Sequence, residues 1–274
     1  MKCADARGSA GCGTEHAGGL LKGTLESSGY ERSFVIHVPE GYDKDEAHPV
    51  VFAFHGKGGS GEVIVNSTRL TEEQWTGDKL VVYPDGWGGF WAGADYSILS
   101  VAEDLSFVRD LVAHLRADFC VDSSRIYATG HSNGGGMVDN IACHGETGKD
   151  FAAFAPIAGA FYANNDDNYE ECDPARALTP VLQIHGGADI TIPYEGGKGS
   201  GGMLPSIPDW LDRWAARSNC GEPITDVVVE DKITSKLWKC QGKAGALRHY
   251  FGVGLGKSFN PVLPIFIDQD LDAN

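Results

Sequence analysis

The chain has 274 residues, 42% of them hydrophobic, and a formal net charge of −16 at pH 7. This length and apolar content allow one sizeable core, so we expect a single domain over residues 1–274. No stretch approaches the roughly 18 consecutive apolar residues of a membrane helix. The acidic balance disfavours nucleic acid and anionic membranes as partners.

The first half of the chain predicts an alternation of strands and a helix. Residues 1–30 are rich in Gly, Ser and Ala, and we expect a loosely structured lead-in there. Residues 33–38 are β-branched and aromatic and predict a strand. The short apolar runs 49–54 and 79–83 predict strands buried on both faces. Residues 104–119 carry an apolar stripe at helical spacing.

The second half continues the same alternation. The predicted elements are a strand at 125–129, a helix at 137–143, strands at 151–158 and 181–184, and a helix at 207–217. This order favours an α/β fold, with a mostly parallel central sheet and helices on both faces. No internal repeat or linker divides the chain.

The segment Gly130-His131-Ser132-Asn133-Gly134 follows a predicted strand and precedes a predicted helix. A serine on such a tight turn, with small residues two positions before and after it, is typical of a hydrolase nucleophile. Ser132 is therefore the candidate nucleophile. The competing interpretation is a glycine-rich turn that only begins a helix.

A tetrahedral intermediate needs backbone N–H donors for its oxyanion. One donor is expected from Asn133, directly after the nucleophile. The other is expected from the glycine loop after the strand at 49–54, where we assign Lys57 and keep Gly56 as the alternative. His55 begins this loop and lies too early in the chain to be the base, so we expect it to hold the loop in shape.

The acid of a catalytic triad should follow a later strand in this fold. Asp189 comes shortly after the strand at 181–184 and is the candidate acid, although it also fits a plain turn aspartate. His185 precedes it on the strand, where a structural role is expected. The sequence predicts no metal site, because it has no CxxC pair and no clustered His, Asp and Glu ligands.

The chain has seven cysteines, a number that suits disulfides in an oxidising compartment and leaves one residue over. From position alone we predict the pairs Cys120–Cys143 and Cys220–Cys240. Asn66-Ser67-Thr68 is a glycosylation sequon, a pattern that also occurs by chance. We expect a secreted, extracellular protein, although no signal peptide is visible in the chain.

Several segments together resemble carbohydrate esterase family 1, most closely its fungal feruloyl esterases and polyhydroxybutyrate-depolymerase-like members. The resemblance covers about residues 30–255. It implies an α/β-hydrolase fold, no cofactor, secretion, and hydrolysis of hydroxycinnamate esters on plant cell-wall polysaccharide or of small phenolic esters. Ser132 and Asp189 match the family's nucleophile and acid. The segments are HGKGG, YPDGW, SRIYATGHSNGGGM, FAPIAGAFY, HGGADITIPY and LPSIPDWLDRWAAR.

An aromatic loop lies between the predicted oxyanion loop and the first long helix. Its residues Trp87, Phe90 and Trp91 offer a wall for a phenolic ring. A role in the hydrophobic core is an equally good interpretation of the same three residues.

The chain departs from the family where the triad histidine is expected. The family has a segment resembling Gly-Leu-Gly-His-Ser-Trp-Pro, and here Lys257 stands at the histidine position. The atypical C-terminus, residues 257–274, lacks the family pattern and its final helix. A lysine with its ordinary pKa of about 10.4 is protonated at neutral pH and cannot accept the serine proton. Burial would lower that pKa, and Asp189 nearby would raise it again.

Two histidines are candidates for a substitute base. His249 lies eight positions before Lys257 on the predicted last strand, which places it down the sheet. His131 adjoins the nucleophile, but its side chain should point away from the Ser132 hydroxyl. Two functions therefore stay open: a serine esterase whose base is unassigned, and a catalytically impaired binding protein that keeps the hydrolase fold.

Overall fold

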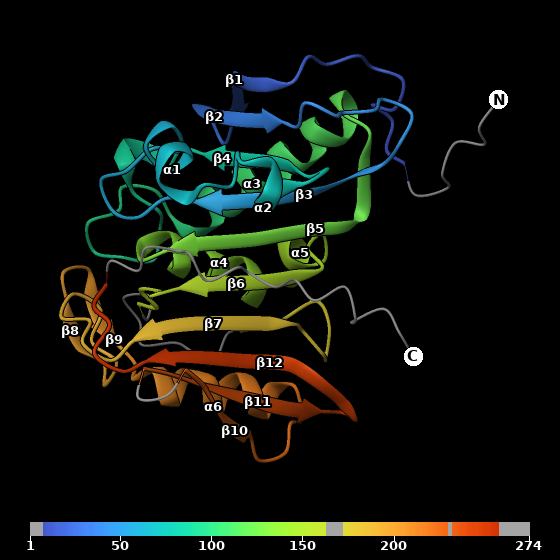
Figure 1. Ribbon diagram of the computed structural model, residues 1–274. Helices are drawn as coiled ribbons and strands as arrows, with labels where there is room; N and C mark the ends of the chain where they lie inside the picture. The colour runs from blue at the N-terminus through green and yellow to red at the C-terminus, as the bar shows by residue number, and fades with distance from the viewer. Residues whose placement is uncertain (1–7, 163–171, 230–231, 258–274) are drawn as a thin grey trace.

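The computed structural model describes residues 8–162, 172–229 and 232–257 of the chain (Figure 1). The strands are β1 (Gly19–Ser27), β2 (Tyr30–Val38), β3 (His48–Phe54), β4 (Leu80–Pro84), β5 (Val121–His131), β6 (Ala153–Ile157), β7 (Val181–Gly186), β8 (Gly197–Gly199), β9 (Gly202–Leu204), β10 (Ile224–Val229), β11 (Ile233–Cys240) and β12 (Lys243–Gly252). The helices are α1 (Gly61–Thr68), α2 (Glu73–Thr76), the 3₁₀ turn η1 (Trp87–Gly89), α3 (Val101–Asp118), α4 (Asn133–Cys143), α5 (Gly145–Gly148) and α6 (Ile207–Arg217).

A ten-stranded sheet forms the centre, in the order β1-β2-β4-β3-β5-β6-β7-β12-β11-β10 (Figure 1). The pairs from β4 to β12 are parallel, and the pairs at both edges are antiparallel. The predicted α/β fold with a mostly parallel central sheet is confirmed. Because parallel strands end at one edge, the loops after β3, β5 and β7 gather there, and these loops carry the candidate catalytic residues.

Strand β3 shows why the central strands are apolar throughout. All seven of its residues are buried. Phe52 belongs to the cluster that packs α3, α4 and α6 onto one face of the sheet. Val51 belongs to a second cluster, with Ile64 of α1, on the opposite face. Helices therefore cover both faces, as predicted.

The expectation of a loose lead-in is wrong for the part that the structure describes. Strand β1 pairs in antiparallel register with β2 along its whole length. The turn between them has positive φ at Ser28 (52°) and Gly29 (82°), as in the two-residue turns that match strand twist. Most β1 side chains are exposed or half-buried, so the strand has no clear apolar alternation and the sequence signal was weak.

Three disulfides join parts of the described chain: Cys12–Cys120, Cys143–Cys172 and Cys220–Cys240. The predicted Cys220–Cys240 bridge is confirmed. The predicted Cys120–Cys143 bridge is wrong, because each of these cysteines has a different partner. Cys120 directly precedes β5 and lies beside the N-terminal segment, whose Ser9 amide donates to the Val121 carbonyl at 3.1 Å. Cys3 lies outside the described residues.

The Cys12–Cys120 bridge should stabilise the fold more than the Cys220–Cys240 bridge. It closes a sequence separation of 108 residues against 20, and a longer loop removes more entropy from the unfolded chain. We expect replacement of both cysteines of the longer bridge by serine to lower the free energy of unfolding by about 1.5 kcal/mol more than the matched replacement of the shorter one. Urea unfolding of the two double variants measures this, and equal losses would contradict it.

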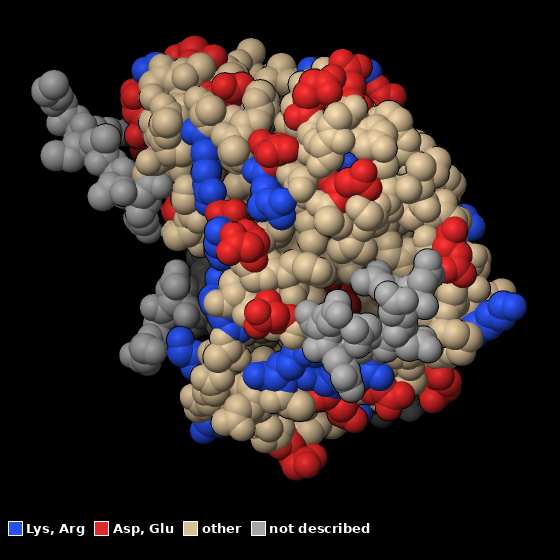
Figure 2. Space-filling model, turned by 180° about the vertical axis from the view of Figure 1, so that it is seen from behind, with Lys and Arg blue, Asp and Glu red and all other residues tan. Residues whose placement is uncertain are grey.

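Charged side chains are scattered over the face opposite to that of Figure 1. Acidic groups are interspersed there with lysines and arginines rather than gathered in one patch (Figure 2). Among the described residues, no helix is long and apolar enough to cross a membrane.

Candidate active site

Ser132 sits on a strained turn between β5 and α4. Its φ of 57° and ψ of −118° lie outside the regions that most residues adopt. The two flanking glycines allow this turn, since a Cβ on Gly130 would lie 2.4 Å from the Gly134 carbonyl oxygen and one on Gly134 would lie 2.2 Å from that of Phe54. The spacing of the motif is therefore imposed by close contact of the turn with β3.

The backbone around Ser132 is held on both sides. Its amide donates to the Ile157 carbonyl at 3.0 Å, and its carbonyl accepts from the Ala160 amide at 2.8 Å. The residue is only 6% exposed. Its hydroxyl does not cap α4, and it has no hydrogen-bond partner among the described residues. The nucleophile position is thus held by its backbone, while no base contacts its hydroxyl among the residues that the structure describes.

The glycine loop after β3 lies directly against Ser132. A Cβ on Gly56 would come within 3.5 Å of the Ser132 Cβ. The amides of Gly58 and Gly59 donate to the carbonyls of Gly89 and Gly56, whereas the Lys57 amide donates to no backbone carbonyl of the described chain. This arrangement fits the predicted second oxyanion donor, and the choice between Lys57 and Gly56 stays a prediction.

Asn133 is the first residue of α4, so its amide has no partner within the helix. Its side chain binds the backbone of the aromatic loop, a role that the sequence did not indicate. The Trp91 amide donates to its Oδ1 at 2.8 Å, and its Nδ2 donates to the Trp91 carbonyl at 3.0 Å. This reciprocal pair locks the aromatic loop to the nucleophile turn.

His55 holds the oxyanion loop in shape, as expected. The Gly86 amide donates to its Nε2 at 2.9 Å, which leaves the proton on Nδ1 to be donated to the Gly56 carbonyl at 2.8 Å. Burial lowers the pKa of this imidazole below its ordinary value, although the bond to Gly56 opposes the shift. His55 is therefore a neutral structural group.

Trp91 was predicted to line the substrate site, and this prediction is wrong. Its side chain is fully buried in the core, where the ring packs edge-on to Phe54 at 5.1 Å and the indole N–H donates to the His55 carbonyl at 3.1 Å. Spacing along the loop could not separate this tryptophan from its neighbours, because all three aromatic side chains lie within five positions.

Phe90 and Trp87 are only half-buried, and their substrate roles stay predictions. Phe90 packs against Tyr96 at 5.3 Å, and Tyr96 in turn packs against Tyr162 at 6.1 Å. The Lys57 ammonium lies 4.3 Å from the centre of the Tyr96 ring. Sequence reasoning missed these two tyrosines, which form an aromatic group beside the oxyanion loop. Trp87 instead packs against Tyr30 at 4.8 Å.

Asp189 lies in the loop after β7 and is buried. Its Oδ1 accepts the amides of Thr191 at 2.8 Å and Ile192 at 2.9 Å. Its Oδ2 is also buried and has no hydrogen-bond partner among the described residues. The nearby His185 does not provide one: its Nε2, 3.8 Å away, donates to the Ile192 carbonyl at 2.9 Å. One carboxylate oxygen of the candidate acid is therefore left without a donor.

The segment that carries Lys257 is bound to this acid loop. The Ala188 amide donates to the Leu255 carbonyl, and the Gly187 amide donates to the Gly252 carbonyl, both at 2.9 Å. The His131 Nε2 lies 3.2 Å from the Lys257 carbonyl. Lys257 thus lies at the end of a segment that contacts both the acid loop and the nucleophile turn, the place where the family's histidine is expected.

Lys257 does not replace an imidazole in its contacts. Burial lowers the pKa of its half-buried ammonium, Asp189 opposes this shift, and Lys57 adds to it. The ammonium does not donate to Asp189 Oδ2. Residues 258–260, which follow in the same motif, and the atypical segment 261–274 lie outside the described residues.

Neither candidate histidine fills the gap. His249 is fully buried in β12. Its Nε2 lies 3.1 Å from the Tyr194 hydroxyl, and its Nδ1 lies 3.3 Å from the Gln183 carbonyl oxygen. Burial lowers its pKa to about 3. It pairs with Gln183 in the sheet, three residues before β7 ends. The His131 Nε2 contacts the Lys257 backbone carbonyl at 3.2 Å, so this nitrogen is already engaged.

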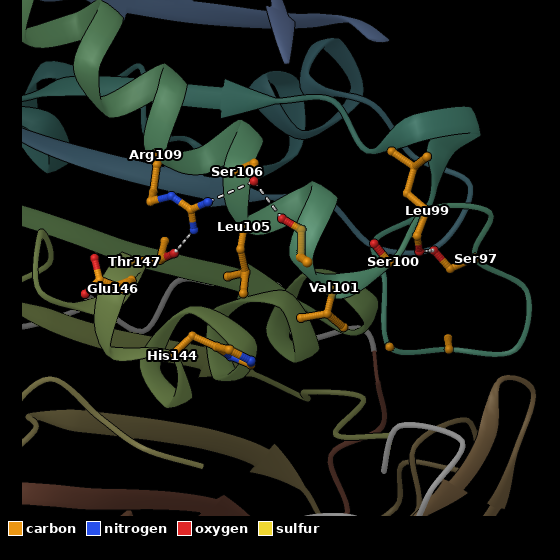
Figure 3. Close-up of a pocket in the computed structure, with 13 residues that line it drawn as sticks. Ser97, Leu99, Ser100, Val101, Leu105, Ser106, Arg109, His144, Glu146 and Thr147 are labelled. Carbon is orange, nitrogen blue, oxygen red and sulfur yellow. Dashed lines mark hydrogen bonds between the residues drawn. The ribbon is translucent and has the colours of Figure 1, made fainter. Parts of the chain in front are cut away.

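A pocket in the described chain lies away from the candidate catalytic residues (Figure 3). It has a volume of about 650 Å³ and lies between the start of α3 and the junction of α4 with α5. Arg109 crosses one side of it and donates to Thr147 and Ser106. None of the candidate catalytic residues lines it. The described residues also contain no group of three His, Cys, Asp or Glu side chains placed to hold a metal.

Comparison with known proteins gave curated relatives but no matching family model. The chain is 30% identical over 196 residues to a probable feruloyl esterase C of Aspergillus clavatus, across 70% of this chain and 65% of the relative. It is 28% identical over 201 residues to feruloyl esterase B of Piromyces equi, across 70% and 37%. The match thus spans 65% of the first relative's length and 37% of the second's.

Solved structures show the same fold. An acetyl xylan esterase from Aspergillus awamori superposes with a TM-score of 0.66 at 18% identity, covering 93% of this chain and 98% of that one. A ferulic acid esterase of carbohydrate esterase family 1 from Anaeromyces mucronatus gives 0.56 at 15% identity, covering 90% and 87%. The predicted α/β-hydrolase fold is confirmed.

Proposed function

The chain is a relative of the fungal feruloyl esterases, and from this relationship we propose that it is a serine carboxylic-ester hydrolase of the secretory pathway. Its proposed substrates are hydroxycinnamate esters on plant cell-wall polysaccharide. The relatives' names and the α/β-hydrolase fold support the ester class. The aromatic group of Phe90, Tyr96 and Tyr162 supports an aromatic acyl group.

The observation that carries the proposal is the conformation of Ser132. A non-glycine residue at φ 57° costs of order 1–3 kcal/mol and persists where the surrounding structure imposes it. Here two glycines without room for a Cβ and three backbone contacts impose it. A protein with no chemistry to perform has no use for a serine held on such a turn below a glycine loop.

In the proposed reaction the Ser132 oxygen attacks the acyl carbon of the ester. The developing oxyanion accepts hydrogen bonds from the backbone amides of Asn133 and Lys57. The carbon–oxygen bond to the alcohol then breaks, and an acyl-enzyme forms. Water then releases the acid. Both steps need a base to take a proton, from Ser132 and then from water, and to return it to the leaving group.

The second candidate function is a binding protein that keeps this cleft without turnover. The specific observation in its favour is that the Ser132 hydroxyl and Asp189 Oδ2 have no partner among the described residues, with Lys257 where an imidazole would connect them. In a serine hydrolase, loss of one triad member leaves only the residual rate that comes from the oxyanion hole and binding.

Hydrolysis of methyl ferulate and of a small acetyl ester by the purified chain, beside equilibrium binding of ferulate, tests the proposal. We expect ferulate to bind and the chain to hydrolyse methyl ferulate slowly, but faster than a boiled sample. Binding without any hydrolysis would favour the second function. Failure of both would contradict the aromatic-ester proposal.

A further inference from the structure

We propose that Asn66 is an N-glycosylation site, and that its glycan covers apolar side chains exposed around helix α1. The inference concerns the compartment and the surface of the protein rather than its catalysis. It does not depend on the proposed function.

Asn66-Ser67-Thr68 is the only Asn-x-Ser/Thr sequon in the sequence. It occupies the last turn of α1, and the helix ends at Arg69, which adopts a left-handed conformation. The Asn66 side chain is exposed, and its Nδ2 donates only within the helix, to the Glu62 carbonyl at 3.0 Å. A glycan on this nitrogen would therefore displace one exposed intrahelical bond and no part of the core.

Two apolar side chains of this segment are exposed, one on α1 and one on α2. Val63 lies three residues earlier, on the same helical surface as Asn66, and is 62% exposed. Trp75 of α2 is 36% exposed, and the Arg69 guanidinium lies 5.9 Å from its ring centre. Apolar area left in water costs free energy. A saccharide on Asn66 would shield Val63, which lies one turn away on α1, and we expect it also to reach Trp75 on α2.

The disulfides give independent support for the compartment in which this modification occurs. Three bridges close separations of 108, 29 and 20 residues, and such bridges form and persist in the secretory pathway and outside the cell. The glycan-transferring machinery meets a nascent chain in that same compartment, before α1 has formed. The exposed position then lets the modified chain fold.

The test is peptide mapping of the full chain secreted from a yeast host with a leader attached. Release of glycans by an amidase in heavy-oxygen water converts a modified asparagine to labelled aspartate. We expect the label at Asn66, its loss in Asn66→Gln and in Thr68→Ala, and its retention in Ser67→Ala. The last variant is the matched control, because the middle position does not determine acceptance. A secreted, disulfide-bonded sample with unlabelled Asn66 would overturn the site.

The covering role has a separate readout. Enzymatic removal of the glycan from the folded protein should raise hydroxyl-radical labelling of Val63 and Trp75, because the glycan no longer covers their exposed area. Ile190, which is 94% exposed in the acid loop, should label equally before and after. Unchanged labelling of Val63 and Trp75 would overturn this part of the inference. Neither experiment measures hydrolysis, so failure of the proposed function would not affect them.

Discussion

Replacing Lys257 with histidine is expected to raise the rate of methyl ferulate hydrolysis by roughly 10²–10⁴-fold, the usual contribution of a positioned general base. The expectation follows from the state of the rest of the site. Ser132 is fixed in a strained turn, and one carboxylate oxygen of Asp189 already accepts hydrogen bonds from two backbone amides. Its other oxygen is buried without a donor. An imidazole N–H between these two groups would satisfy the carboxylate and leave the second ring nitrogen to accept the serine proton.

Histidine is the residue for this position because of its pKa near 6.5. Burial lowers the pKa of the Lys257 ammonium, and the Asp189 carboxylate opposes this shift. The Lys257→His variant should show a rate that rises through pH 6 to 7 as the imidazole loses its proton. The parent should show no such step.

Lys257→Met provides the matched control, since it removes the charge and supplies no base. If it gained as much as Lys257→His, the improvement would come from loss of the ammonium rather than from a restored triad. If Lys257→His stayed at the parent rate, the atypical C-terminus would impair more than the base, and the binding function would gain support.

Ser132→Ala, placed in the Lys257→His background, is expected to remove the whole of that gain. Triad members act as a unit, so once a base is present the loss of the nucleophile returns the rate to the residual level set by the oxyanion hole and binding. In the parent the same substitution should change the rate far less, because none of the described residues places a base against the serine hydroxyl there. The four rates, measured with one substrate at one pH, form a double-mutant cycle.

Strong coupling in this cycle would assign the reaction to Ser132. Equal effects of Ser132→Ala in both backgrounds would contradict it and would send the search for the nucleophile elsewhere. Ferulate binding to all four proteins serves as the control for folding, because neither side chain is expected to hold the aromatic ring.

The candidate site could be located from the sequence because its positions are fixed by backbone geometry. Gly130 and Gly134 are needed where β5, α4 and β3 meet without room for a Cβ, and such contacts leave a short motif. Asp189 and Lys257 were placed by the order of elements after parallel strands, and the structure brings their loops together through backbone hydrogen bonds. Chain order is enough for this, since parallel strands share one edge.

The errors concern side chains and long-range partners, which local patterns do not encode. Trp91 lies in a loop of aromatic residues, and only the tertiary structure shows that Asn133 holds it inward. Cys120 and Cys143 flank one strand–turn–helix unit, but they point to different neighbours. Strand β1 has little buried surface of its own and is fixed by pairing with β2.

The Cys12–Cys120 bridge also determines where the chain can be shortened. A truncation before β2 would remove the Gly-, Ser- and Ala-rich segment at the start of the chain, and with it Cys12 and strand β1. Cys120 would then remain as a free thiol that is 1% exposed in the core. During oxidative folding that thiol could capture Cys143 or Cys172 and trap the nucleophile helix in a wrong pairing. The N-terminal segment therefore belongs to the folding unit, and expression boundaries should be drawn before it.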